Sequence, residues 1–496
     1  MVESKLEELV VAGSNPVGHP TSISQSKKVT YSEHFLCARR LIAEKSNRRR
    51  LKISLRTLYN ILFAIFFVVF APYYFWRMRR RGNWRPGFAQ RFARYHSELK
   101  QALTNRHTVW IHAVSVGEVN LCTQLIRALE PRAPNVKFVV STTTTTGMAE
   151  LRRRLPTHVS KIYYPIDRRK FVARALAVVN PQAIVLVEAE IWPNFLWRVQ
   201  EIRVPIFLAN ARLSEKSFRG YKRFGFLFKP LFASFAGVGA QNEQDAARLR
   251  EVGCRPEAVR VVGNLKFDAA KLDERHTLDI PAMLRQLGVP PDAQILVAGS
   301  THDGEEIILT QIARRLRSRF PKLFLVLVPR HFERCRELGR ELRERNVKLV
   351  YRSEISRDTR FREGEVECLL VNTTGELRFF YEHSTVVFVG KSLTAMGGQN
   401  PIEPGALGKA MVFGPNMQNF ADVTRGFLAQ NAALQVGDPE RLEDALRGLL
   451  ADENRRVELG KNALKVVREN LGAVERTVEM ILEQLKPRGI YITPKK

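Results

Sequence analysis

Cysteine is scarce in this chain, and its few thiols are scattered. Five cysteines occur among 496 residues, with no Cys-x-x-Cys pair and no histidine at a spacing typical of zinc sites; they are Cys37, Cys122, Cys254, Cys335 and Cys368. The pattern therefore indicates neither a disulfide framework nor a structural zinc site. We expect reduced, structural thiols, as in a protein whose folded part faces the cytoplasm.

Several signatures of common chemistries are also missing. No Asp-x-Asp pair follows a predicted strand, and no cluster of His, Asp or Glu has the spacing of metal ligands, so the sequence predicts no metal. The chain has no Gly-x-Ser-x-Gly elbow, no P-loop and no isolated Cys–His signature. Its basic stretches lack the interleaved aromatics of single-strand nucleic-acid platforms, so nucleic acid is not an expected partner.

Acidic residues are few relative to basic ones. The chain has 50 Asp and Glu against 79 Lys and Arg, a formal net charge of +29 and an isoelectric point near 10.3. A surplus of this size implies a nucleic acid, an anionic membrane surface or acidic substrates as partners. A chain of this length, with an ordinary 45% of hydrophobic residues, divides into about two to four domains.

A long apolar run occupies 58–76. It has the length of a membrane-spanning helix, and Tyr73, Tyr74 and Trp76 are typical of an interfacial aromatic belt. Basic residues at both ends fit either a span or a helix lodged in one leaflet, and they should attract anionic lipids. A buried core helix is the alternative. We predict a membrane anchor with basic flanks at 51–81, after a disordered basic leader at 1–50.

After the anchor, short β-branched runs alternate with helical stretches, which predicts an α/β fold with two parallel, doubly wound sheets. We place an N-terminal Rossmann-like domain at 82–275 and a C-terminal one at 276–485, braced by the last helices. A ligand cleft is expected between them, at the carboxyl ends of the strands. The expected strands are 108–113, 136–141, 183–187, 206–209, 237–240 and 259–262, then 295–298, 323–328, 347–351, 367–371, 386–389 and 410–413.

The segment 397–404 (Gly-Gly-Gln-Asn-Pro-Ile-Glu-Pro) predicts a phosphate site. Its two glycines allow the close approach of a ligand, Asn400 is a good helix cap, and Pro401 suits the first helical position. Backbone N–H groups of that turn would hold a phosphate, with Glu403 on a neighbouring sugar hydroxyl. This arrangement suits a nucleotide-sugar donor and predicts a glycosyltransferase. An ordinary capped helix after a loop is the alternative.

Carboxylates stand at two further strand ends. Glu118 follows the first strand at the start of a helix, where the helix dipole favours its ionised form and it can take a proton from an attacking hydroxyl. The alternative is a glutamate that only caps the helix. Glu188 and Glu190 follow another strand, and at this spacing they should share one face and orient an acceptor near Glu118. A helix start with Pro193 in its first turn is the simpler interpretation there.

Cationic and polar residues at other strand ends complete the predicted site. Lys266 would point into the cleft, where an ammonium can stabilise a departing phosphate. Arg330 ends a buried strand, and a guanidinium is the natural partner of phosphate oxygens. Residues 373–376 (Thr-Thr-Gly-Glu) resemble a turn at a helix start that contacts ribose or phosphate.

A family resemblance extends over about 82–485 and rests on several strings that occur in family order. The chain resembles the bacterial 3-deoxy-D-manno-octulosonic acid (Kdo) transferase of lipopolysaccharide synthesis. The matching strings are HAVSVGEV (112–119), EAEIWPN (188–194), ANARLS (209–214), AQNE (240–243), GNLKFD (263–268), GSTHDGEE (299–306), VPRH (328–331) and GGQNPIEP (397–404).

The resemblance implies a GT-B fold and an enzyme that transfers Kdo from CMP-Kdo to a lipid A precursor of the lipid IVA type, with inversion at the anomeric carbon. It implies no cofactor and no metal, and a bacterial inner-membrane location with the catalytic domains on the cytoplasmic side, next to anionic lipids. By matching position, Glu118 is the general base, and Glu188 and Lys266 stabilise the transition state. The implied CMP contacts are Pro329, Arg330, Thr374, Gly375, Glu376, Asn400, Pro401, Ile402 and Glu403.

The chain departs from the family pattern in three places. The leader at 1–50 is unusually long, Gln399 stands where the family commonly has His, and 391–396 differs from the usual run with glycine and arginine. Two other functions stay open from the sequence. One is a GT-B glycosyltransferase with another nucleotide donor. The other is a membrane-anchored protein that binds anionic lipid or nucleic acid.

Overall fold

The structure, a computed structural model, describes residues 55–73, 75–76, 79–80, 85–188, 190–270, 278–356 and 358–494. The expected leader at 1–50 lies outside these residues. The chain divides into two compact units, Met1–Trp84 and Arg85–Lys496.

The first unit contains an apolar helix, Leu55–Tyr73. Its 19 residues have a mean hydropathy of 1.8 over the best window, and none of that window is buried. Large side chains such as Ile65, Val68 and Val69 are exposed along it. A helix of this length and composition is able to cross a membrane. The described helix therefore does not have the buried side chains that the alternative of a core helix requires.

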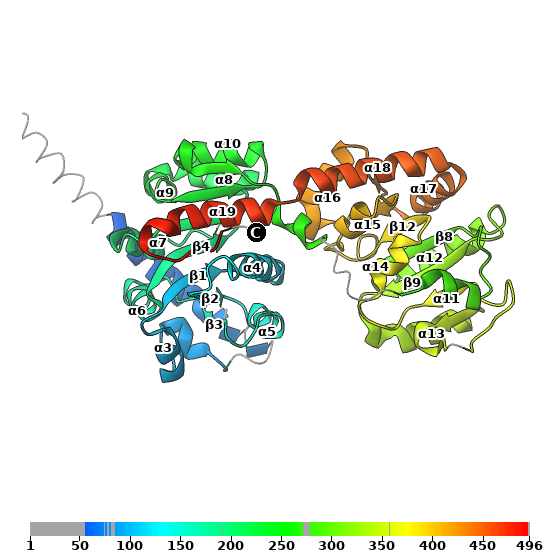
Figure 1. The fold of residues 1–496 in the computed structure, drawn as a ribbon, viewed down its shortest axis with the longest axis horizontal. Helices are drawn as coiled ribbons and strands as arrows, with labels where there is room; N and C mark the ends of the chain where they lie inside the picture. The colour runs from blue at the N-terminus through cyan, green and yellow to red at the C-terminus, as the bar shows by residue number, and fades with distance from the viewer. Residues whose placement is uncertain are drawn as a thin grey trace, which may run out of the picture. The chain divides into compact units, whose positions relative to one another are not determined.

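The first sheet of the second unit has seven strands, all parallel, in the order β3-β2-β1-β4-β5-β6-β7. Figure 1 labels the first four strands of this order. The strands are β1 (His107–His112), β2 (Val136–Thr142), β3 (Ser160–Tyr163), β4 (Pro181–Val187), β5 (Ile206–Ala211), β6 (Gly237–Ala240) and β7 (Val259–Val261). Its helices are α3 (Ser97–Leu103), α4 (Val116–Leu129), α5 (Thr145–Arg154), α6 (Arg169–Val179), α7 (Pro193–Glu201), α8 (Glu215–Arg223), α9 (Gly225–Phe232) and α10 (Glu243–Glu251).

The second sheet repeats the plan, with seven parallel strands in the order β10-β11-β9-β8-β12-β13-β14. The strands are β8 (Ile295–Thr301), β9 (Phe324–Pro329), β10 (Leu349–Tyr351), β11 (Cys368–Leu370), β12 (Val386–Val389), β13 (Met411–Phe413) and β14 (Leu434–Gln435). Its helices are α11 (Ile280–Gln286), α12 (Glu305–Leu316), α13 (Cys335–Glu344), α14 (Leu377–Glu382), α15 (Ile402–Ala406), α16 (Ala421–Ala429), α17 (Pro439–Ala451) and α18 (Glu453–Asn470). The predicted pair of parallel α/β sheets is therefore confirmed.

The apolar runs that predicted the strands are buried on both faces of each sheet. Neighbouring residues of β8 enter different hydrophobic clusters: Val297 packs on one face with Phe427, and Leu296 on the other with Leu446. Successive side chains of a strand point to opposite faces, so a strand covered on both sides reads as a continuous apolar run. The strands β3 and β14 were not predicted, because Ser160–Tyr163 and Leu434–Gln435 are too short to show such a run.

The last helix, α19 (Ala473–Leu485), packs against the first sheet although it follows the second in sequence. Its Val478 and Ile481 belong to the same buried cluster as Val109 of β1. Asp268 fixes its start by accepting from the N–H groups of Gly472 at 2.7 Å and Val474 at 2.6 Å. The domain boundaries 82–275 and 276–485 stay a proposal. The packing of α19 adds that this helix belongs to the hydrophobic core of the first domain.

Strand order reverses at one place in each sheet, between β1 and β4 in the first and between β8 and β12 in the second. In open α/β sheets such a switch point lies beside the carboxyl ends of strands that lead away in opposite directions, and ligands bind there. The loops after these four strands contain Glu118, Glu188, Glu305 and 390–404. The fold therefore directs attention to these loops.

Candidate active site

Glu118 lies in the first turn of α4, directly after β1. The Ser115 hydroxyl accepts from the Glu118 N–H at 3.3 Å, and the Glu118 carboxylate accepts in return from the Ser115 N–H at 3.3 Å, which forms a capping box. The carboxylate also accepts from the Val114 N–H and from the Ser115 hydroxyl, each at 2.7 Å. Glu118 thus caps its helix, and the same bonds fix the direction of its carboxylate.

The surroundings of this carboxylate disfavour its ionised form. The Glu118 side chain is only 8% exposed. Burial raises its pKa above the ordinary 4.5, and the hydrogen bonds from Val114 and Ser115 oppose that rise only in part. The negative charges of Glu188 and Glu190 raise the pKa further. Burial thus acts against the effect that the helix dipole has on this carboxylate. A carboxylate with a raised pKa is a stronger proton acceptor, so capping and base catalysis are compatible.

Glu188 and Glu190 do not share a strand face. The strand β4 ends at Val187, and Glu188 has a φ of 60°, a left-handed conformation that is uncommon for a residue with a side chain. The expected alternation was wrong because the chain turns before it reaches Glu190. Both carboxylates nevertheless lie close enough to Glu118 to raise its pKa. Burial also raises the pKa of Glu190, whose Oε2 accepts from the Trp192 indole at 3.0 Å.

The simpler interpretation of this segment, a helix start with Pro193 in the first turn, is confirmed. Pro193 occupies the first turn of α7, with Trp192 at the N-cap. Proline is suited to that position because its missing N–H would have no partner there. The Glu188–Glu190 segment is therefore the connection between β4 and a proline-started helix, and its carboxylates stand at the switch point of the first sheet.

Lys266 belongs to the short helix η3 (Leu265–Ala270), after β7. Its ammonium donates to the Asn419 carbonyl at 3.3 Å and lies 5.6 Å from the ring centre of Phe420. Burial lowers the pKa of Lys266, and the negative charge of Glu188 opposes that change. Because Glu118 also acts on this pKa, the structure brings the three predicted catalytic residues into one electrostatic cluster.

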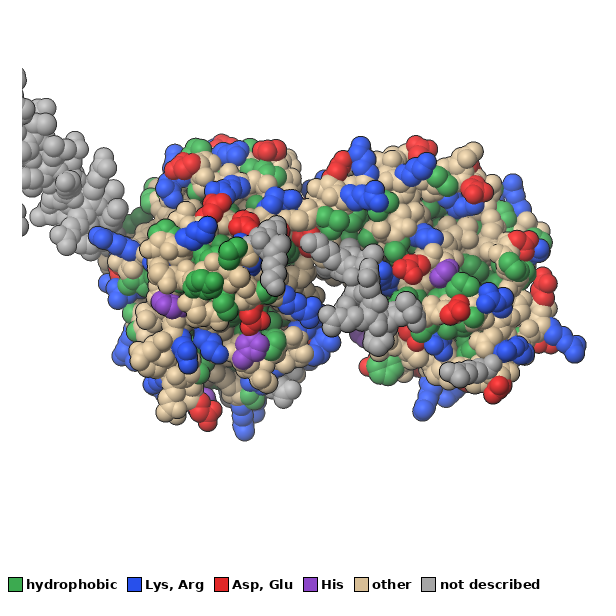
Figure 2. All heavy atoms as spheres, in the orientation of Figure 1, with side chains coloured by type: hydrophobic (Ala, Val, Ile, Leu, Met, Phe, Trp, Pro, Cys, Tyr) green, Lys and Arg blue, Asp and Glu red, His purple; other side chains and the backbone are tan. Residues whose placement is uncertain are grey.

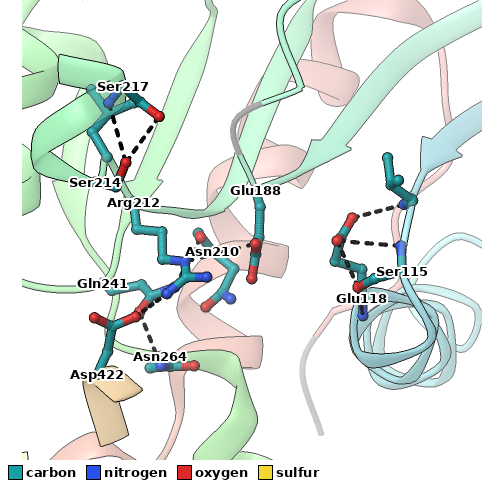
Figure 3. A network of polar contacts seen from close by, with 12 residues as sticks. Ser115, Glu118, Glu188, Asn210, Arg212, Ser214, Ser217, Gln241, Asn264 and Asp422 are labelled. Carbon is teal, nitrogen blue, oxygen red and sulfur yellow. Dashed lines mark hydrogen bonds and ion pairs between the residues drawn. The ribbon is translucent and has the colours of Figure 1, made fainter. Parts of the chain in front are cut away.

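Arg212 is a member of this cluster that sequence reasoning missed. It follows β5 and forms an ion pair with Asp422 of α16, while its Nε lies 3.7 Å from Glu188 Oε2 (Figure 3). A residue of the first half is thereby joined to a residue of the second. The signal was available in the string Ala-Asn-Ala-Arg directly after a predicted strand, but only the fold shows that this strand lies next to β4.

Arg330 and Glu403 come together on the second sheet. Pro329 ends β9, and the Arg330 N–H donates to the Thr301 carbonyl at 3.0 Å, leaving the guanidinium side chain exposed. Burial raises the pKa of Glu403, and the hydrogen bond from Asn400 and the positive charge of Arg330 oppose that rise. The predicted phosphate partner and the predicted sugar partner are thus close enough to interact.

The turn at 397–404 differs in detail from the prediction. Helix α15 begins at Ile402, so Pro401 stands at the N-cap rather than at the first helical position. Asn400 still acts as a local cap: its Oδ1 accepts from the Ile402 N–H at 3.1 Å, and its Nδ2 donates to Glu403 at 3.1 Å. Gly398 has a φ of 70°, and a Cβ there would meet the Met417 Sδ at 2.5 Å, so glycine is needed here for packing against Met417. The close approach of a ligand to these glycines stays a prediction.

The turn at 373–376 stands before α14, as predicted for a helix start. Gly375 has a φ of 87°, and Glu376 is the N-cap residue. Glu376 accepts from the Thr373 hydroxyl at 2.6 Å and pairs with the Arg352 guanidinium at 3.0 Å. Thr374 and Gly375 are exposed. The structure thus ties Glu376 to its own loop and to Arg352, and the predicted contacts of 374–376 with a nucleotide stay a prediction.

Charge is mixed on the face of the described molecule that Figure 2 draws. On the face drawn in Figure 2, Lys and Arg side chains alternate with Asp and Glu. Within the described ranges, no group of three or more His, Cys, Asp or Glu residues is placed to hold a metal ion. Among the described residues, the cluster around Glu118 and the neighbouring Arg330 and Glu403 are the candidates for chemistry.

Two doubly wound parallel sheets in one unit, with the site residues at the carboxyl ends of their strands, are the arrangement of the GT-B fold. A profile of the family described as 3-Deoxy-D-manno-octulosonic-acid transferase (kdotransferase) matches residues 86–269. Among solved structures, the C-terminal CMP-Kdo binding domain of WaaA from Acinetobacter baumannii is 30% identical, with a TM-score of 0.35, and covers 38% of this chain and 95% of that one.

Two curated relatives extend over most of the chain. The 3-deoxy-D-manno-octulosonic acid transferase of Haemophilus influenzae is 30% identical over 406 residues, which are 81% of this chain and 92% of the relative. The enzyme of the same name from Bordetella pertussis is 32% identical over 420 residues, which are 83% of this chain and 95% of the relative. The chain belongs to the Kdo transferase family.

Proposed function

We propose that the protein transfers Kdo from CMP-Kdo to a lipid A precursor, with inversion at the anomeric carbon. The observation that carries the proposal is Glu118: a buried carboxylate of raised pKa, fixed in direction by Val114 and Ser115, at the switch point of the first sheet. Membership of the Kdo transferase family supports the choice of sugar and acceptor.

In the proposed reaction Glu118 accepts the proton of an acceptor hydroxyl as that oxygen forms a bond to the anomeric carbon of Kdo. The bond from this carbon to the phosphate oxygen breaks at the same time, and CMP leaves with the electron pair. Lys266 stabilises the negative charge that develops on the leaving phosphate. Glu188, at the same switch point, stabilises the positive character of the sugar in the transition state. Attack on the face opposite the leaving group inverts the centre.

On the donor side we assign the nucleotide to the second sheet. Arg330, with Pro329 before it, would bind the phosphate, since a guanidinium pairs well with phosphate oxygens. Asn400 to Glu403 and Thr374 to Glu376 would contact the ribose and base. A monophosphate leaving group carries little charge, so side chains can replace a metal, and we propose a reaction that needs neither metal nor cofactor.

The helix Leu55–Tyr73 supports a membrane location. We propose the bacterial inner membrane, with the second unit on the cytoplasmic side and the basic residues beside the helix on anionic lipids. Flotation with vesicles tests the lipid preference. Stronger recovery with phosphatidylglycerol vesicles than with phosphatidylcholine vesicles would support it, and equal recovery with both would remove the anionic lipid from the proposal.

The function is tested by incubating the full chain in detergent with freshly generated CMP-Kdo and a tetraacylated lipid A precursor, and by following the product by mass spectrometry. We expect one or more Kdo residues on the acceptor, inhibition by CMP but not by UDP, and unchanged turnover with EDTA. Inhibition by UDP alone would favour another nucleotide donor. No product from the folded protein, together with salt-sensitive binding to nucleic acid, would favour a binding protein instead.

A further inference from the structure

Three side-chain amides form a hydrogen-bonded network next to the turn of Lys266, at the carboxyl ends of β5, β6 and β7. They belong to Asn210, Gln241 and Asn264. Asn264 Nδ2 donates to Gln241 Oε1 at 2.9 Å, and Gln241 Nε2 donates to the main-chain carbonyl of Asn210 at 3.1 Å. Asn264 Oδ1 accepts from the Lys266 N–H at 3.0 Å, and Asn210 Oδ1 accepts from the Leu265 N–H at 3.1 Å. These amides therefore fix the turn that carries Lys266.

The side-chain amide nitrogen of Asn210 has no hydrogen-bond acceptor in the described structure. Asn210 is 0% exposed, and its oxygen must face the Leu265 N–H, because only an oxygen can accept that bond. The amide nitrogen Nδ2 then occupies the other branch, and it has no hydrogen-bond partner in the part of the chain that the structure describes. Buried polar groups are almost always paired, so an unpaired amide calls for an acceptor.

The cation of the same region lacks a counter-ion in direct contact. The Lys266 ammonium bonds to a neutral carbonyl, that of Asn419, and makes no ion pair with any described carboxylate. Arg212, also nearby, is already paired with Asp422. Figure 3 draws Asn210 between Glu188 and the Gln241–Asn264 pair, with its side chain toward the centre of the cluster. The unpaired amide donor thus belongs to the side chain that holds Leu265, the residue before the lysine whose ammonium has no contacting carboxylate among the described residues.

We propose that Asn210 is a substrate-binding residue, whose amide nitrogen donates to an anionic oxygen of the substrate beside Lys266. A sugar hydroxyl would satisfy the amide but leave the ammonium without a counter-ion, whereas an oxyanion satisfies both. This inference rests on the proposed function, which offers three oxyanions: the donor phosphate on which Lys266 acts, the carboxylate of the donor sugar acid, and a phosphate of the glycolipid acceptor.

The substitution Asn210→Asp tests the donor bond alone. Aspartate keeps an oxygen for the Leu265 N–H, so Lys266 stays in place, but it replaces the amide nitrogen with a second acceptor that repels an oxyanion. We expect KM for the substrate that carries the oxyanion to rise by about 10- to 100-fold, with kcat changed little. Asn210→Gly fits the φ of 53° but removes both functions, so KM should rise and kcat should fall as well.

The acceptor is supplied with and without its phosphates, and KM for each substrate is measured separately. A rise in KM for CMP-Kdo that persists with the dephosphorylated acceptor assigns the donor: unchanged binding of CMP then points to the carboxylate, and weakened binding of CMP points to the phosphate. A rise in KM for the acceptor that vanishes on dephosphorylation assigns the acceptor phosphate. Asn180→Asp, the same change at another left-handed asparagine, at the exposed end of α6, is the matched control and should keep both constants.

Folding is checked by the thermal midpoint and by the circular dichroism spectrum, and if Asn210→Asp fails to fold, Asn210→Gly carries the KM measurement. Wild-type product together with KM values of the Asn210 variant within twofold of wild type would overturn this inference and leave the proposed function standing. Absence of product from the wild type would overturn the proposed function, and this inference with it.

Discussion

The two sheets of the second unit place a glutamate after their first switch-point strand and use it in opposite ways. Glu305, after β8, is 0% exposed and accepts from four main-chain N–H groups. One of these donors is in its own loop, and the other three are Lys391, Ser392 and Leu393 in the loop after β12. A single carboxylate thus ties the two switch-point loops of the second sheet together.

Glu118, after β1, takes its hydrogen bonds only from its own loop, from Val114 and Ser115. Across the switch point stands another carboxylate, Glu188, whose charge raises the pKa of Glu118 rather than bonding to it. The comparison teaches that a buried carboxylate with four N–H donors, such as Glu305, stabilises the fold. A buried carboxylate close to other negative charges, such as Glu118, retains the capacity to accept a proton.

The largest effect is expected for Glu118→Gln, which keeps an oxygen for the two bonds from Ser115 but turns its amide nitrogen toward the Val114 N–H and removes the base. We expect kcat to fall by about 10²- to 10⁴-fold, with only a small drop in the thermal midpoint because a single N–H group loses its acceptor. Steady-state transfer to the lipid A precursor measures it. The matched control is Ser115→Ala, which removes the N-cap hydroxyl but leaves the carboxylate. If Ser115→Ala lost as much turnover as Glu118→Gln, capping would explain both and the assignment of the base would fail.

An intermediate effect, on stability, is expected for Glu305→Gln. In the wild type, both carboxylate oxygens of Glu305 accept from main-chain N–H groups. In the variant, the amide nitrogen replaces one of these oxygens and faces main-chain N–H groups, so the free energy of unfolding should fall by about 2–4 kcal/mol. Urea unfolding measures the change, and Glu118→Gln in the same experiment should lose less. Equal losses in stability for the two variants would contradict the division of roles between the two switch points.

The smallest effect is expected for Arg330→Ala on the second sheet. Loss of a guanidinium from a phosphate should raise KM for CMP-Kdo by about 10-fold and leave kcat within a fewfold of wild type. CMP binding by calorimetry gives a second measure of the same contact. Arg319→Ala, at an exposed arginine of the same half, is the control. CMP binding unaltered by Arg330→Ala would move the phosphate site elsewhere.

Much of this architecture can be predicted from the sequence, because buried parallel strands are visible as apolar runs. The residues that follow these runs lie in the segments that form the candidate site. Glu118, Lys266 and Arg330 could be found in this way. The turn at Glu188 could not, since no local pattern announces a φ of 60° directly after Val187. Two further contacts join residues far apart in sequence, so only the strand order reveals them. They are the Arg212–Asp422 ion pair and the hydrogen bonds that Glu305 accepts from 391–393.

The most direct test of the central claim is the pH dependence of kcat/KM for the wild type and for Glu190→Gln. Burial first, and then the charges of Glu188 and Glu190, raise the pKa of Glu118 above 4.5. A base must be unprotonated, so the rate should fall as the pH drops through this raised pKa. Glu190→Gln keeps an acceptor for Trp192 but removes one negative charge, so the acid limb should move to lower pH. An acid limb that does not move would contradict the account.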